Sequence, residues 1–175
     1  MCLCAICVCL VFNLKSASAK GQKTPQIEYS CYISNAKNND EASLLLWNWL
    51  LKYTRLTPQH AASHGIYQKN THAIFYDLDG DGTREILGTH NATTIAGNGN
   101  NLLYILKYDE KEFSKYRRIS QKLYFDIHKP IQIYSDETGK YKRIGAKLLA
   151  PNELDAEVKN VTFVFDKRKN SYTTK

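Results

Sequence analysis

The sequence predicts an α+β domain in which one N-terminal helix, or two, packs on a meandering antiparallel β-sheet. Apolar residues recur with helical spacing over residues 41–53, ahead of every segment that has the pattern of a strand. From residue 72 onward, short segments rich in β-branched and aromatic residues alternate with turn residues about every ten positions. A chain of 175 residues can bury one ordinary hydrophobic core. We therefore expect a single α+β domain over residues 39–175.

Residues 1–19 have the features of a signal peptide. The apolar run over residues 2–14 is too short to span a membrane, and Ala17 and Ala19 provide a small-x-small cleavage site. The basic residues that usually open such a signal are absent before Lys15, and a buried N-terminal strand is the alternative. We expect cleavage after Ala19, a periplasmic or secreted location, and no stable membrane span in the mature chain.

Cleavage of the signal peptide would leave a single cysteine in the mature chain. Four of the five lie in the predicted signal peptide, namely Cys2, Cys4, Cys7 and Cys9. The remaining one, Cys31, cannot form an internal disulfide in the mature chain, so it is either a free thiol or a partner in a bond between chains.

The first elements of the mature chain are a polar leader and a helix. Residues 20–38 are polar and form the leader. The helix over residues 41–53 can be capped by Asp40. Its apolar face includes Trp47, which we expect to be in the core, whereas the role of Trp49 stays open.

A second, short helix is predicted over residues 58–64, because Thr57 can cap it and Pro58 suits its first position. It places His60 and His64 four residues apart on one face, a spacing that can bind zinc. No third ligand lies in this segment, and we expect a structural or surface role for the pair.

The rest of the chain predicts β-structure. The expected strands cover residues 72–77, 84–90, 101–107, 113–119, 122–127, 131–135, 141–149 and 160–166. Between the second and third of these strands lies a polar, glycine-containing loop over residues 91–101. It is either a plain connection or a recognition loop.

The stretch from Asp77 to Glu85 specifies a chemistry. Asp77, Asp79 and Asp81 alternate along the chain and Gly82 follows at once, so short carboxylates can converge on a hard cation while the glycine permits a sharp turn. The alternative is an ordinary Asp-Gly hairpin turn with solvated carboxylates. It is not an EF-hand loop, because its twelfth position holds Gly88 in place of glutamate and its flanks have the composition of strands.

This stretch resembles the calcium-binding hairpins of the FG-GAP/VCBS type, in which an aromatic residue precedes Asp-x-Asp-x-Asp-Gly-x-x-Glu. The matching residues are Tyr76, Asp77, Asp79, Asp81, Gly82, Glu85 and Ile86. The resemblance implies a calcium site with side-chain oxygens from Asp77, Asp79 and Asp81. It further implies a backbone carbonyl from Thr83 and a carboxylate from Glu85. Those families repeat the motif in propeller blades, whereas this chain has it once, as do some small exported bacterial proteins, so we do not expect a propeller.

The net charge of +7 comes from dispersed lysines and arginines. No helix-turn-helix, zinc-finger or RNP-like pattern accompanies them, so we do not expect nucleic-acid binding. An exported basic surface instead suits an anionic envelope polymer or an acidic protein partner.

These observations favour an exported, calcium-binding, non-enzymatic binding protein. One alternative is a small secreted hydrolase or toxin that combines the acidic turn with His60, His64 or His90. The other is a periplasmic immunity or inhibitor protein that acts through the loop over residues 91–101.

Overall fold

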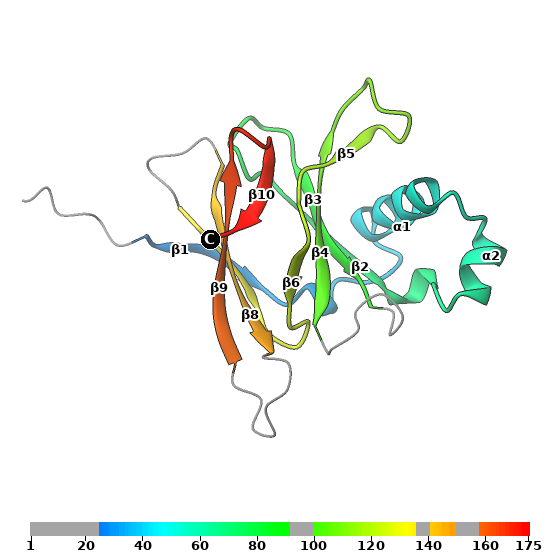
Figure 1. Ribbon diagram of the computed structural model, residues 1–175, viewed down its shortest axis with the longest axis horizontal. Coiled ribbons are helices and arrows are strands. Elements are labelled where there is room, and N and C mark those ends of the chain that lie inside the picture. Colours follow the sequence, from blue (N-terminus) through cyan, green and yellow to red (C-terminus); the bar gives the residue numbers. More distant parts are fainter. Residues whose placement is uncertain (1–24, 92–99, 136–140, 150–157) are drawn as a thin grey trace, which may run out of the picture.

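The computed structural model describes residues 25–91, 100–135, 141–149 and 158–175 (Figure 1). The predicted signal peptide and most of the loop over residues 91–101 lie outside these ranges. The helices are α1 (Glu41–Thr54) and α2 (Pro58–Ser63), with short 3-10 helices η1 (Ile33–Asn35) and η2 (Gln68–Asn70). The strands are β1 (Ile27–Cys31), β2 (Thr71–Tyr76), β3 (Glu85–His90), β4 (Asn101–Tyr108), β5 (Tyr116–Arg118), β6 (Leu123–Phe125), β7 (Ile131–Tyr134), β8 (Arg143–Leu149), β9 (Val158–Asp166) and β10 (Ser171–Thr174).

The predicted α+β class with one meandering sheet is wrong, because the protein is mostly β. Within the described ranges, ten strands form two antiparallel sheets, and α1 is the only helix longer than six residues. One sheet has the order β1-β7-β8-β9-β10. The other has the order β2-β3-β4-β5, with β6 paired to β4. The prediction of a single sheet rested on the even spacing of strands and turns. That spacing is the same in one meandering sheet and in two sheets, because it does not show which distant strands pair.

Each predicted strand overlaps one of the strands β2 to β9, but the two outermost strands of the first sheet were not predicted. The strand β1 lies in the segment expected to be a polar leader, and it pairs antiparallel with β7, where Cys31 faces Ile131. The strand β10 pairs antiparallel with β9. Both pairings add edges to a sheet whose centre is β8.

The main hydrophobic core lies between the two sheets. Alternate residues of β4, Leu103 and Ile105, point into it, because successive side chains of a strand face opposite sides. From the other sheet it receives residues such as Ile133 and Phe163. Tyr172 of β10 is fully buried there, and its hydroxyl donates a hydrogen bond of 2.7 Å to the carbonyl of Lys142.

The helix α1 covers the outer face of the β2–β5 sheet, opposite the first sheet (Figure 1). Two residues of β4 that point the other way, Tyr104 and Leu106, pack there against Leu46 and Trp49. Trp47 is buried as predicted, and Trp49 is buried as well, with its indole N–H donating a 3.1 Å hydrogen bond to the carbonyl of Tyr116. The strand β3 therefore lies between two cores, and all its residues are buried.

The short helix α2 forms close to its predicted position. The hydroxyl of Thr57 accepts a hydrogen bond from the backbone N–H of His60, which satisfies one of the free amides of its first turn. No helix in the described ranges has the length and apolar character needed to cross a membrane.

Candidate metal site at the β2–β3 turn

The acidic stretch forms the turn of the β2–β3 hairpin. The strands pair from Thr71 with His90 up to Tyr76 with Glu85, so the last ladder pair sets Glu85 at the mouth of the turn. Gly80 and Gly82 have φ angles of 71° and 86°, in the left-handed region that glycine enters without strain. The predicted hairpin geometry is confirmed.

Asp77 holds the turn from within. One carboxylate oxygen, Oδ1, accepts a 2.7 Å hydrogen bond from the amide of Gly80, and the other, Oδ2, accepts a 3.0 Å bond from the amide of Gly82. Asp81 accepts a 2.8 Å hydrogen bond from the amide of Thr83 in the same way. Such bonds are what aspartates in plain turns make, so they fix the loop without requiring an ion.

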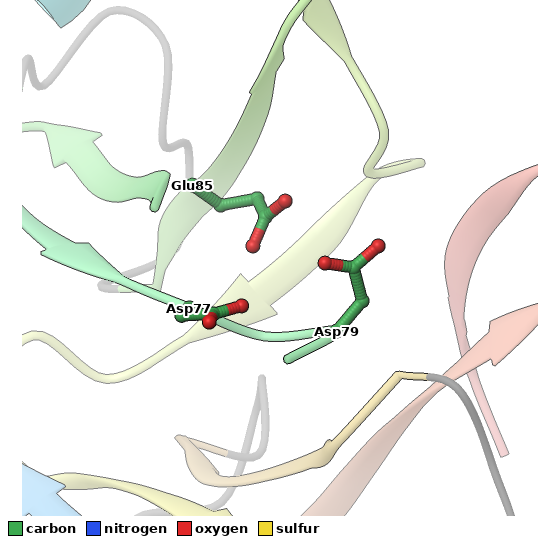
Figure 2. A group of neighbouring side chains, drawn as sticks. All are labelled: Asp77, Asp79 and Glu85. Carbon is green, nitrogen blue, oxygen red and sulfur yellow. The ribbon is translucent and has the colours of Figure 1, made fainter. Parts of the chain in front are cut away.

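Three of the predicted ligands come together. Oxygens of Asp77, Asp79 and Glu85 all lie within 4.8 Å of one another, and this is the only such group of three in the part of the chain that the structure describes. Figure 2 shows the three carboxylates facing a shared space, two from the turn and one from β3. The side chains of Asp79 and Glu85 have 0% exposure. Asp81 and Thr83 are not part of this group and are exposed.

The position of Glu85 explains its electrostatics. As the first residue of a fully buried strand it is removed from water, and burial raises the pKa of its carboxyl group. The amide of Leu78 donates a 2.8 Å hydrogen bond to Oε2 and opposes that rise, while Oε1 is buried without a hydrogen bond. A cation near Oε1 would stabilise the ionised form of this carboxyl group.

Such a cation is present on the chain itself. The Nζ atom of Lys107 lies 2.9 Å from Asp79 Oδ2, 2.8 Å from Asp81 Oδ2 and 3.3 Å from Glu85 Oε1. Burial alone would lower the pKa of Lys107, but the hydrogen bonds to Asp81 and Asp79 outweigh it and raise that pKa above its ordinary value. Lys107 was not among the predicted site residues. In the sequence it is only a lone lysine after the apolar run 102–106, and its place beside Glu85 depends on the pairing of β3 with β4.

The same region connects the two sheets. The Lys107 ammonium lies 5.7 Å from the centre of the Tyr141 ring, which stacks on Phe165 of β9 at 3.8 Å. Beside it, the amide of Lys142 donates a 2.8 Å hydrogen bond to the carbonyl of Leu78 in the turn. The conformation of the turn is thereby linked to the first sheet through a side chain and a backbone bond.

The donor set suits a hard divalent cation. It offers carboxylate oxygens, which calcium and magnesium prefer, and no sulfur or imidazole ligand, which would favour zinc. The structure thus supports a triad that could hold a metal ion. The other predicted ligands lie outside the triad: the carboxylate of Asp81 accepts hydrogen bonds from the amide of Thr83 and from Lys107.

The histidines lie elsewhere. Both His60, on α2, and His64, the residue that follows α2, are exposed, and His64 Nδ1 is 2.8 Å from the His60 carbonyl oxygen. His90 is buried at the far end of β3, with Nδ1 2.8 Å from the Thr71 hydroxyl. Burial and the charge of His72 lower the pKa of His90 to about 4, so its ring is neutral at pH 7. In the described ranges, the acidic group therefore includes no histidine.

Comparisons of the chain with protein-family models, with curated proteins and with solved structures give no match.

Proposed function

We propose that the protein is an exported calcium-binding protein that acts by binding a partner and not by catalysis. The observation that carries this proposal is the convergence of Asp77, Asp79 and Glu85 within 4.8 Å at the β2–β3 turn. The short signal-like run over residues 2–14 supports export.

Calcium is favoured over magnesium by the form of the site. Calcium accepts six to eight oxygen ligands in flexible arrangements, whereas magnesium demands near-ideal octahedral geometry and holds its waters firmly. A turn with two glycines and an exposed Asp81 can adjust around a large ion. The FG-GAP/VCBS-type residue pattern supports the same ion, with Asp81 and Thr83 completing the ligand set.

A binding role is favoured over catalysis by the chemistry of the carboxylates. Aspartates that hold calcium stay ionised and are poor proton donors. The basic surface, with its net charge of +7, suits an anionic envelope polymer or an acidic protein.

Thermal unfolding tests the proposal. Extracellular calcium modules commonly bind with dissociation constants of about 0.1 to 1 mM. A site with a constant near ~0.1 mM should gain about 2.7 kcal/mol of stability at ~10 mM calcium, because the ion binds the folded turn and not the open chain. Magnesium at the same concentration should stabilise less. Equal melting temperatures of the wild type in calcium and in chelator would refute calcium binding.

Two variants localise the effect. Asp79→Asn should abolish most of the calcium-dependent increment, because it removes the charge of a fully buried ligand. Glu110→Gln removes an exposed carboxylate from the β4–β5 turn and should leave the increment unchanged. The comparison uses the difference between calcium and chelator for each variant, so a loss of stability in the ion-free Asp79→Asn protein does not affect it.

A further inference from the structure

We propose that the Lys107 ammonium is the resident cation of the acidic turn and that calcium binds by displacing it. This inference rests on the proposed calcium function and adds the way in which the site is regulated. Its basis is the position of Lys107 Nζ, which lies within 2.8 to 3.3 Å of three carboxylate oxygens from Asp79, Asp81 and Glu85.

The two cations require the same oxygens. Asp79 and Glu85 belong to the triad that could hold a metal ion, and both also pair with Lys107. An ammonium and a divalent ion on the same carboxylates would be like charges at close range in a partly buried site, where screening by water is weak. One cation must therefore leave when the other binds.

Repulsion between the carboxylates of the turn favours a cation there, and Lys107 supplies one. Without any cation, the carboxylates of Asp77, Asp79 and Glu85 would lie within 4.8 Å of one another, and that of Asp81 would be close by, since it reaches the same ammonium. The Oε1 atom of Glu85 is buried and makes no hydrogen bond, and the Lys107 ammonium places a positive charge 3.3 Å from it. One ammonium against four carboxylates still leaves the turn negative, which continues to attract a divalent ion.

The side chain of Lys107 can also move from the turn into solvent. It is 20% exposed, and the next residue, Tyr108, ends the strand with 42% exposure. The ammonium can reach solvent by side-chain rotation, without breaking the pairing of β4 with β3. Leaving the turn also takes it away from the Tyr141 ring, 5.7 Å from Nζ, so the exchange changes the contact between the turn and the first sheet.

Competition predicts that removing the ammonium strengthens calcium binding. Lys107→Met keeps the length and the apolar stem of the side chain but carries no charge. We expect this variant to bind calcium about tenfold tighter or more in calorimetric titration, a typical size for coupling between two ligands. The control is Lys122→Met, which removes an exposed lysine and should leave the affinity unchanged.

The wild type provides a second measurement that does not depend on how well the variant folds. The ammonium resonance of Lys107, followed by ¹H–¹⁵N correlation, should move towards the positions of exposed lysines as calcium is added. Equal calcium affinity of wild type and Lys107→Met, or a Lys107 resonance that is unaffected by bound calcium, would overturn the competition while leaving calcium binding intact.

The remaining outcomes separate the two proposals. In one outcome, Lys107→Met binds calcium but the wild type does not at concentrations up to ~10 mM. This result would show that Lys107 competes with calcium, but it would refute the proposed calcium-binding function of the native protein. Absence of binding in both proteins would refute both.

Discussion

The Nζ atom of Lys107 lies 2.8 Å from Oδ2 of Asp81, so a cation on β4 is bonded to the exposed tip of the β2–β3 turn. This hydrogen bond, and then the bond from the amide of Thr83, lower the pKa of Asp81 to about 2. The turn between two strands thus owes part of its electrostatics to a third strand, and the consequences can be measured.

The titration of Asp81 should depend on Lys107. Followed by NMR in chelator, the carboxyl group of Asp81 should titrate with a midpoint of about 2 in the wild type, below its ordinary value of 3.8. In Lys107→Met the midpoint should rise, though not fully, because the Thr83 amide still donates. Stabilisation by Asp81 is complete above pH 3.8 and is lost as the pH falls towards about 2. An unchanged midpoint in the variant would mean that the ion pair does not form in solution.

The packing of α1 on the sheet makes Gly88 a sensitive position. A Cβ atom there would lie 2.5 Å from Ala73 Cβ, 2.6 Å from the His72 carbonyl oxygen and 2.6 Å from Leu46 Cδ2. Because backbone and a buried helix face cannot both move away, Gly88→Ala should lower the free energy of unfolding by about 1–3 kcal/mol or more, as urea denaturation would show.

Gly145→Ala is the matched control for Gly88→Ala. Its new Cβ would lie 2.8 Å from the ring of Tyr134, a half-buried side chain that can rotate. The cost should therefore be smaller than at Gly88. Equal losses at both glycines would contradict the close packing of α1 against β2 and β3.

The histidines in and directly after α2 should not affect stability. His60 and His64 are exposed, and in the described ranges they join no acidic group that could hold a metal. Replacing both with alanine should change the free energy of unfolding by less than about 0.5 kcal/mol, the usual range for surface sites. Stoichiometric zinc in the purified wild type that is absent from the double variant would overturn this expectation and favour a hydrolase.

Local sequence patterns predicted the helices and the strands β2 to β9, but not β1 and β10 or the way in which the strands assemble. The β-rich segments, the helix before them and the acidic hairpin were predictable, because each depends on neighbours in the chain. The pairing of β1 with β7 joins residues about a hundred positions apart, such as Cys31 and Ile131, and β1 itself contains Glu28 and Ser30. No local pattern distinguishes such a strand from a polar leader. The sequence therefore did not show that β1 and β7 to β10 form a sheet of their own.

The candidate site likewise contains residues that local patterns predict and one that they do not. Asp77, Asp79 and Glu85 were predictable, because the turn and the pairing of Tyr76 with Glu85 beside it bring them together. Lys107 was not, because its place beside the turn depends on the register between β3 and β4, in which Ile86 faces Leu106. The pairing of Lys107 with the acidic group thus depends on tertiary structure, which local sequence patterns do not contain.

His90 predicts how the stability of the protein changes with pH. Its side chain is 1% exposed, stacks against Trp47 with ring centres 6.1 Å apart, and bonds to Thr71 through Nδ1. Burial first, and then the charge of His72, lower its pKa from 6.5 to about 4 in the folded state. The unfolded chain therefore binds a proton as the pH falls below 6.5 while the folded chain does not. The stabilisation is complete above pH 6.5 and is lost as the pH falls towards about 4.

The expected size of this loss between pH 7 and pH 5 is about 2 kcal/mol, from the linkage between proton binding and unfolding. His90→Asn keeps a polar group near the position of Nδ1 for Thr71 but cannot titrate, so its free energy of unfolding should fall by about 2 kcal/mol less over that range. His60→Asn, at an exposed histidine, should follow the wild type. Urea denaturation of the three proteins at pH 7 and pH 5 measures the difference. If His90→Asn loses as much stability as the wild type, the His90 ring is protonated in the folded protein at pH 5, and β3 does not bury it as the structure describes.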